Sequence, residues 1–120
     1  MSTKHTPVIK DSGKREDFDT GSRRDTNEGK SRPDLASPFL LDRLGKHMAL
    51  GAEKYTAWNW AKGQPSSRYR ESLARHLMSH DMGDTEEDHL AAAVFNLMGM
   101  IHNQEVDKGL VDWPLDWGNL

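Results

Sequence analysis

The segment from residue 89 to residue 101, HLAAAVFNLMGMI, most constrains the fold of this chain. Its apolar side chains recur at helical spacing in two adjoining stripes: Leu90, Val94, Leu97 and Ile101 in one, and His89, Ala93, Asn96 and Met100 in the other. A helix that is apolar on nearly every side is central in a bundle or lies at a subunit interface. We therefore predict an all-α protein, a small helical bundle completed by oligomerisation.

Two further segments show helical periodicity. Ser37 followed by Pro38 is typical of a helix start, because the hydroxyl caps the first turn and proline lacks an N–H that has no partner there. We predict one helix over about residues 38–55 and a second from residue 66 or 67 to about residue 80. For the third helix, Thr85 and Asp88 have the spacing of a capping box, and the helix should end near residue 107.

The composition of the chain changes near residue 35. The first 34 residues carry many charges of both signs and too few apolar side chains to bury a face. We predict that residues 1–34 form a flexible, irregular N-terminal arm and that residues 35–120 form the all-α domain.

Composition also excludes several classes of function. The chain has no cysteine, which removes disulfides, thiolate catalysis and cysteine-based zinc sites. Its net charge of -3 and pI near 6.0 argue against stable nucleic-acid binding, which needs a basic surplus. No apolar run approaches the roughly 20 residues of a membrane span, and the start does not resemble a signal peptide, so we expect a cytoplasmic protein without membrane contact.

Each predicted helix carries a histidine on its apolar side: His47, His76 and His89. Burying a neutral imidazole without a partner costs about 1 to 3 kcal/mol, so each needs a hydrogen bond or a metal ion. A satisfied core histidine explains any one of them, and Asn96 can bond a backbone carbonyl. Convergence of several such groups from separate helices favours a site, because each unmatched group adds its own penalty.

Glu71 and Asp88 are candidate metal ligands, together with His89 or Asn96. Carboxylates with one imidazole suit Mg2+ or Mn2+ better than Zn2+. Both carboxylates also have structural explanations, since Asp88 can belong to a helix cap and Glu71 can pair with Arg75 one turn later.

Basic residues supply the charge that a polyphosphate requires, and arginine forks match its oxygens in pairs. The candidates are Lys54, Arg68 and Arg75 in the domain and Lys30 and Arg32 in the arm. Asn59 would offer its amide to a purine base, and Trp60 would offer a ring for the base to stack on. The tryptophan can equally well pack its loop against the hydrophobic core.

Five stretches carry a resemblance to a known family. They are DTNEGKSRPDLASPFLLDRLGKH, GAEKY, NWAKGQP, SRYRESLARHL and MGDTEEDHLAAAVFNLM. In this order they resemble the phage and bacterial dATP/dGTP diphosphohydrolase N-terminal domain family, over residues 20 to about 108. The resemblance implies a MazG-like all-α fold, a homodimer or homotetramer, and metal-dependent hydrolysis of dGTP or dATP to the monophosphate. In phages that use 2-aminoadenine, MazZ-like members feed modified-base synthesis. If this chain is phage-encoded, the resemblance implies a protein of the host cytoplasm.

The family motifs fall on particular residues of this chain. The RH pair falls on Arg75 and His76, the DH pair on Asp88 and His89, the asparagine of the third helix on Asn96, and the KY and NW pairs on Lys54, Tyr55, Asn59 and Trp60. Typical MazG proteins hold metal with ExxE on one helix and ExxD on the next. This chain has neither pair at those places, so the ligand set stays open.

The leading hypothesis is hydrolysis of a purine dNTP at the α-phosphorus, which gives dNMP and pyrophosphate. Glu71 and Asp88 would hold one or more Mg2+ or Mn2+ ions that polarise the phosphate and activate water. His89 or Asn96 would complete the ligand set, and His76 or a carboxylate would accept the proton.

Two other classes of function compete with this hypothesis. A non-catalytic nucleotide-binding or adaptor module would use the third helix as a dimer seam, with polar residues that specify register, and His89→Ala would then lower oligomer stability. A phage accessory protein that binds DNA through its arm would show strongly salt-dependent affinity, and the acidic pI counts against it.

Overall fold

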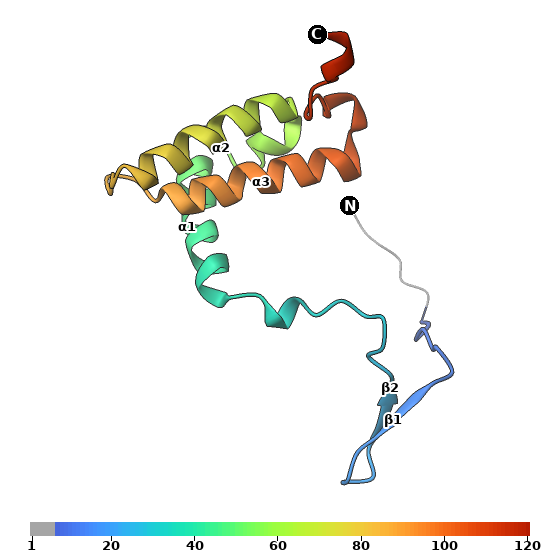
Figure 1. Cartoon of the computed structure of the whole chain (residues 1–120). Coiled ribbons are helices and arrows are strands. Elements are labelled where there is room, and N and C mark those ends of the chain that lie inside the picture. Colours follow the sequence, from blue (N-terminus) through green and yellow to red (C-terminus); the bar gives the residue numbers. More distant parts are fainter. Residues whose placement is uncertain (1–6) are drawn as a thin grey trace. The chain divides into compact units, whose positions relative to one another are not determined.

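The computed structural model describes residues 7–120. The chain divides into two compact units, with the boundary between Leu35 and Ala36. The second unit contains three helices and no strand, which confirms the predicted all-α class (Figure 1). None of the helices described over residues 7–120 is long and apolar enough to cross a bilayer.

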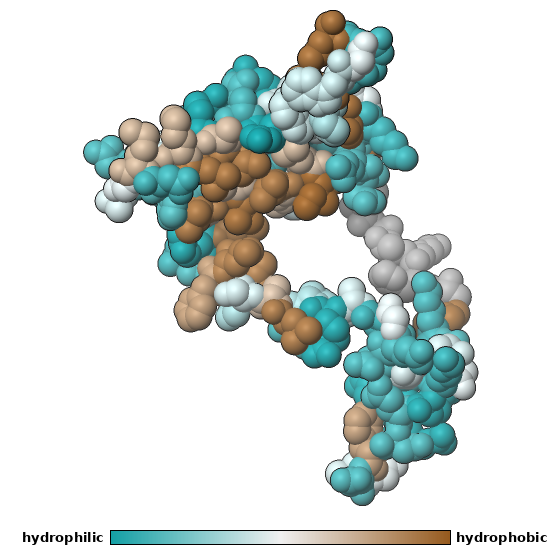
Figure 2. All heavy atoms as spheres, viewed as in Figure 1, coloured by the Kyte–Doolittle hydropathy of each residue, from teal (hydrophilic) through white to brown (hydrophobic). Residues whose placement is uncertain are grey.

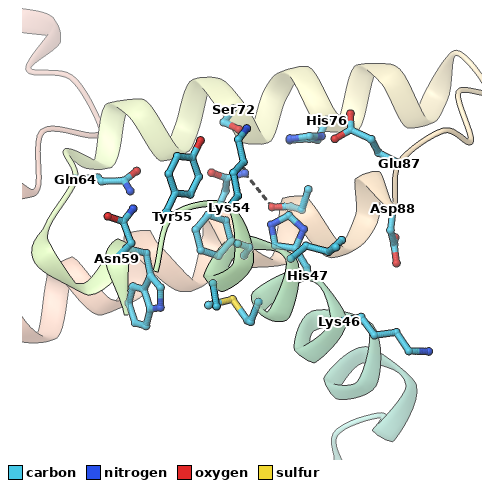
Figure 3. A pocket seen from close by; sticks show the side chains of 18 of the residues that line it. Lys46, His47, Lys54, Tyr55, Asn59, Gln64, Ser72, His76, Glu87 and Asp88 are labelled. Atoms are coloured by element: carbon cyan, nitrogen blue, oxygen red, sulfur yellow. Dashed lines mark hydrogen bonds between the residues drawn. The ribbon is translucent and has the colours of Figure 1, made fainter. Parts of the chain in front are cut away.

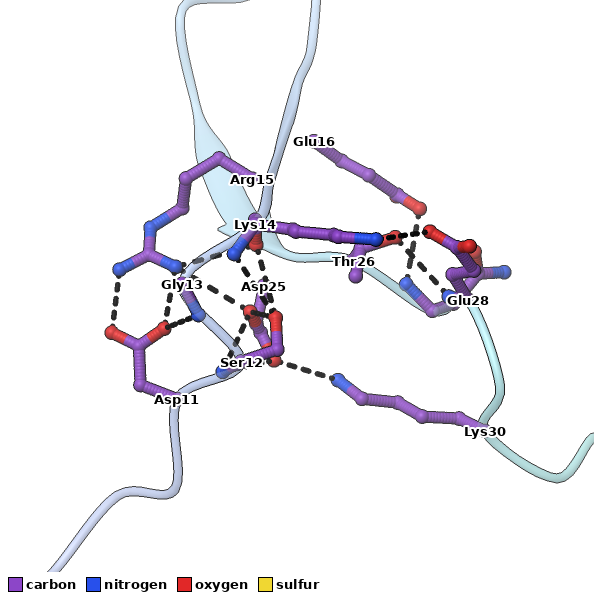
Figure 4. A network of polar contacts seen from close by, with 11 residues as sticks. Asp11, Ser12, Gly13, Lys14, Arg15, Glu16, Asp25, Thr26, Glu28 and Lys30 are labelled. Carbon is purple, nitrogen blue, oxygen red and sulfur yellow. Dashed lines mark hydrogen bonds and ion pairs between the residues drawn. The ribbon is translucent and has the colours of Figure 1, made fainter.

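The N-terminal unit contains a short antiparallel hairpin of β1 (Arg15–Asp17) and β2 (Arg23–Asp25). Its register places Arg15 opposite Asp25 and Asp17 opposite Arg23, so opposite charges face each other across the strands. Figure 4 shows Asp25 at the centre of a polar network, where it accepts a hydrogen bond from Ser12 Oγ at 2.5 Å and pairs with Arg15 at 3.4 Å. The predicted irregular arm therefore needs one correction, because complementary charges give it a hairpin.

Helix α1 (Pro38–Lys54) begins as predicted. Ser37 Oγ accepts a hydrogen bond from the backbone N–H of Phe39 at 3.2 Å, and Pro38 occupies the first turn. No residue of α1 is buried; His47 and Met48 are half-buried, and Leu40 is 43% exposed.

Helices α2 (Ser66–Asp81) and α3 (His89–Val106) lie side by side and antiparallel (Figure 1). Tyr69 and Leu73 of α2 are buried in their interface. A Cβ atom added at Gly99 of α3 would overlap the ring of Tyr69, so the absence of a side chain there lets the two helices approach.

The start of α3 differs from the predicted capping box. Asp88 is itself the N-cap residue, and its side chain accepts a hydrogen bond from the backbone N–H of Ala91 at 3.1 Å. Arg43 of α1 holds the same carboxylate through two hydrogen bonds of 2.8 and 2.5 Å. The prediction with Thr85 as the cap was wrong, because a long-range ion pair fixes Asp88 at the helix end.

The first turn of α2 is satisfied from the C-terminal segment. Ser67 donates hydrogen bonds to the Asp112 carboxylate from its backbone N–H and from its Oγ, each at 2.6 Å. The neighbouring Trp113 ring lies 5.4 Å below the Arg70 guanidinium. These contacts attach the end of the chain to the helical unit.

The two sides of α3 have opposite character. His89, Asn96 and Asn103 are 3 to 4% exposed, whereas Leu97 and Ile101 are 45 and 59% exposed. Figure 2 shows hydrophobic side chains gathered on the visible face over α1 and α3. Three of the four residues in the predicted stripe of Leu90, Val94, Leu97 and Ile101 are therefore open to solvent in the single chain, and burial of this stripe in an oligomer stays a prediction.

Candidate functional site

An open cavity of about 960 Å³ lies in the helical unit. It is lined by α1, the segment after α1, α2, the loop between α2 and α3, and the N-terminal half of α3. Figure 3 shows Asn59 and Gln64 at one end, and the His76 ring beside the Glu87 carboxylate at the other. The size is that of a cavity that binds a cofactor or a small substrate.

One end of the cavity is aromatic. The Trp58 and Trp60 rings lie 6.1 Å apart, centroid to centroid, and Trp60 packs edge-on against His102 at 4.8 Å. Trp58 is 72% exposed and also lines the cavity, beside Asn59. Trp60 thus anchors the loop as well as lining the cavity, and Trp58 is the ring with the freer face.

The predicted phosphate-binding residues of the domain, Lys54, Arg68 and Arg75, all line the cavity. Arg75 donates a hydrogen bond to Glu71 at 3.0 Å, and Arg68 approaches the same carboxylate at 3.8 Å. Lys54 lies 5.2 Å above the Tyr55 ring and forms no ion pair with any residue between 7 and 120. Lys54 is therefore the wall cation whose charge is least neutralised.

Glu71, a predicted metal ligand, pairs with Arg75 on the surface of α2. It is not among the residues that line the cavity, and the Arg75 hydrogen bond lowers the pKa of its carboxyl group. Within residues 7–120, Glu71 forms no ligand cluster with Asp88 and His89. The structure gives Glu71 the surface ion pair that its spacing from Arg75 also allowed.

Asp88 is likewise engaged by protein groups. The Arg43 hydrogen bonds, together with the helix N–H, lower the pKa of Asp88 to about 2. In Figure 3 its carboxylate points away from Glu87 and His76. Asp88 lines the cavity, but its carboxylate caps α3 and forms an ion pair with Arg43 of α1.

A different group of side chains converges at this end of the cavity. His76, Glu87 and His89 each offer a ligand atom, and these atoms lie within 4.8 Å of one another. The Nδ1 atoms of His76 and His89 are 2.9 Å apart. Two imidazoles and one carboxylate from α2, the α2–α3 loop and α3 form a set that can hold a divalent metal ion.

Asp84 fixes the ring of His89. One carboxylate oxygen of Asp84 lies 2.9 Å from His89 Nε2, and the other accepts the backbone N–H of Glu86 at 2.9 Å. The Glu86 hydrogen bond and, secondarily, the His89 contact lower the pKa of Asp84. Its oxygen near Nε2 therefore acts as an acceptor, which leaves His89 Nδ1 facing the cluster.

Asn96 and His47 line the cavity without joining the cluster. Asn96 donates to the backbone carbonyl of Ala92 at 2.9 Å and to Ser72 Oγ at 3.2 Å, so it makes the simple backbone contact that the sequence also allowed. His47 packs against the Phe95 ring, with centroids 5.2 Å apart, and burial, followed by the nearby His76, lowers the pKa of His47.

The remaining predicted residues lie in the N-terminal unit. Lys30 pairs with Asp25 at 3.4 Å, and Arg32 pairs with Asp34 at 2.8 Å. Within that unit, both cations have carboxylate partners.

Sequence reasoning missed Glu87 and Asp84. Both lie in the break between α2 and α3, where spacing along the chain does not determine direction. His76 and His89 could be recognised as inward residues by helical periodicity, but the loop alone decides which carboxylate reaches them. The one usable signal was the proximity in sequence of Asp84, Glu87 and His89.

No curated protein and no solved structure is significantly similar to the chain. A family model described as dATP/dGTP diphosphohydrolase, N-terminal, matches residues 20–112. The matched region contains the whole cavity and the His76, Glu87 and His89 cluster. Because the match covers most of its length, this chain belongs to the dATP/dGTP diphosphohydrolase N-terminal domain family.

Proposed function

We propose that this protein hydrolyses purine deoxynucleoside triphosphates, dGTP or dATP, to dNMP and pyrophosphate in phage nucleotide metabolism. The family name points to a dATP/dGTP diphosphohydrolase. The observation that carries the proposal is a single cavity with an aromatic end, a basic wall and a cluster of potential metal ligands.

The distribution of side chains in the cavity matches the parts of a dNTP. Trp58 offers an exposed ring on which a purine can stack, and Asn59 beside it offers an amide for the base edge. Lys54 and the arginines of α2 supply positive charge where the phosphate chain would lie. The reacting phosphate would then lie toward His76 and Glu87.

The chemistry requires an activated water and charge neutralisation at the phosphate. A divalent cation supplies both when it is bound, because it polarises the phosphate and lowers the pKa of water. We assign the metal-binding role to His76, Glu87 and His89 instead of Glu71 and Asp88, whose carboxylates are occupied by arginines.

His47 is suited to accept the proton of the attacking water. It lines the same cavity, and its lowered pKa keeps the imidazole neutral near pH 7. A neutral imidazole can accept a proton, whereas Asp88, with a pKa of about 2, is a weak base. The predicted base His76 is engaged with His89 instead.

The first test is turnover. Purified protein is incubated with each of the four dNTPs and a divalent metal, and dNMP and pyrophosphate are measured. We expect both products from dGTP or dATP and slower reaction of the pyrimidine nucleotides. If all four dNTPs remain intact with every metal tried, the proposal is wrong.

The second test concerns the basic wall. Lys54→Met should lower kcat/KM for the purine dNTP roughly 10- to 100-fold, because it removes a charged donor to the phosphates. Lys62→Met is the matched control, since Lys62 does not line the cavity. Equal activity of the two variants would contradict a phosphate-binding role for Lys54.

A further inference from the structure

We propose that His76, Glu87 and His89 form a site for a divalent transition metal ion of the Co2+ or Zn2+ class, in preference to Mg2+, and that Asp84 positions His89 for it. The use of the ion in catalysis rests on the proposed function. The binding itself does not, and it can be measured without any nucleotide.

The spacing of the two imidazoles fits neighbouring metal ligands. Two nitrogens that bind one ion at right angles, each at about 2.1 Å, lie about 3 Å apart. The observed separation of His76 Nδ1 and His89 Nδ1 is 2.9 Å. The ring centroids are 5.2 Å apart, so in this state the two nitrogens face each other through a hydrogen bond. An ion would replace this hydrogen bond with a small turn of each ring. Neutral His76 would move its proton from Nδ1 to Nε2 through solvent, so that the Nδ1 lone pairs of both rings face the ion.

For His89, the hydrogen-bond pattern already sets the tautomer that metal binding needs. Since the Asp84 carboxylate accepts a hydrogen bond from Nε2 of His89, neutral His89 carries its proton on Nε2 and keeps the Nδ1 lone pair free for the cluster. A carboxylate that orients a metal-binding histidine in this way is a recurrent feature of metal sites. His89 is only 4% exposed, so its orientation is fixed by packing as well.

The ligand set distinguishes between metals. Mg2+ prefers oxygen ligands and retains most of its water, whereas imidazole nitrogen favours first-row transition metals and zinc. Within residues 7–120, this is the one group of three histidine or carboxylate side chains close enough to share an ion, and two of its three members are imidazoles. The proposed ion therefore differs from the expected Mg2+ or Mn2+, an expectation that depended on Glu71 and Asp88 as ligands.

The chain also provides room for substrate at the ion. His76 and Glu87 line the large cavity, while His89 and Glu87 line a second hollow of about 340 Å³ next to Asp84. Three protein ligands leave open coordination positions, as catalytic metal sites require. A phosphate oxygen or a water could occupy them from the large cavity.

The test measures metal binding by the full-length protein in the absence of nucleotide. Isothermal titration with Co2+, Zn2+ and Mg2+ should show at least 10-fold tighter binding of Co2+ and Zn2+ than of Mg2+, and bound Co2+ should give visible absorption bands. Mg2+ binding as tight as Co2+ binding would overturn the proposal. Turnover with Mg2+ in a protein that fails to bind Co2+ would leave the proposed function standing and this inference refuted.

Variants identify the ligands and the role of Asp84. Glu87→Gln should weaken Co2+ binding more than 10-fold, and Glu86→Gln, which removes the same charge one residue away, should not. Asp84→Asn should weaken it 10- to 100-fold, because the new amide would face Nε2 with a donor and move the His89 proton to Nδ1. Its oxygen can still accept the Glu86 N–H, so the loop should keep its structure. If Glu87→Gln and Asp84→Asn bind Co2+ as tightly as Glu86→Gln does, the roles of Glu87 as a ligand and of Asp84 as a positioning residue are refuted.

Discussion

The two faces of α3 contradict what their hydropathy suggests. The face toward α2 and the loop carries His89, Asn96 and Asn103, all almost fully buried, whereas the neighbouring face exposes Leu97 and Ile101. The comparison shows that hydrogen bonding and side-chain size decide which face of this helix packs inside. Within residues 7–120, every buried polar side-chain atom has a hydrogen-bond partner.

The buried face works because small and polar residues alternate along it. The small side chains on this face, at Ala92, Ala93 and Gly99, allow α2 to come close to α3. The short distance between the helices lets the polar side chains of α3 form hydrogen bonds with groups of α2 and the segment before it. A buried polar group costs little once it is paired, and a great deal once its partner is removed. Substitutions on the two faces should therefore have very different effects on the free energy of unfolding.

The largest effect on the free energy of unfolding is expected from Gly99→Ala. The added methyl would overlap the Tyr69 ring, which is 2% exposed and has no room to move. Overpacking of this kind costs about 1 to 3 kcal/mol, and the rigid ring places this case near the upper value. Gly45→Ala in α1 is the control, because nothing lies within 4 Å of the new methyl and alanine favours a helix by about 0.5 to 1 kcal/mol. Urea unfolding should show opposite signs for the two variants, and a stable Gly99→Ala protein would disprove the close contact.

The second-largest effect on the free energy of unfolding is expected from Asn103→Ala. Asn103 donates to the Gln64 carbonyl at 2.8 Å and to Ser66 Oγ at 3.1 Å, and the substitution leaves these buried acceptors without that donor. The expected loss is about 1 to 3 kcal/mol in urea unfolding. Asn103→Leu should not restore stability, although it makes the helix more apolar. Gln104→Ala on the exposed side should stay within about 0.5 kcal/mol of the parent, and a comparable loss there would remove the contrast between the faces.

Local signals in the sequence predicted the elements well. Ser37 and Pro38 define the start of α1 through contacts within one turn, and α2 begins at Ser66, as predicted. Asp88 was assigned to the wrong capping position, because its role depends on Arg43, which is 45 residues away in the sequence. The hairpin of the arm was missed for a related reason, since cross-strand charge pairs leave no hydrophobic pattern.

The candidate site could be predicted only in part. Helical spacing shows that His76 and His89 point inward, and the basic residues of α1 and α2 do line a common cavity. The carboxylate partner of the histidines was missed because Glu87 lies in a loop, whose backbone direction follows from tertiary packing and not from periodicity. Glu71, a predicted metal ligand, forms the surface ion pair with Arg75 that its helical spacing also allowed.

The smallest effect on the folded chain is expected on the exposed face. Leu97→Gln combined with Ile101→Gln removes apolar side chains that are 45 and 59% exposed, so each substitution should change the free energy of unfolding at low protein concentration by no more than about 0.5 kcal/mol.

The same double variant tests the predicted oligomer, because an apolar face of this kind is typical of a surface that a second copy covers. Sedimentation velocity should show the parent as a dimer or larger species and the double variant shifted toward the monomer. Met78→Gln, which alters an exposed side chain of α2, should leave the distribution unchanged. A parent that sediments as a monomer, or a double variant that unfolds as readily as Gly99→Ala, would show that the exposed leucine and isoleucine have another role.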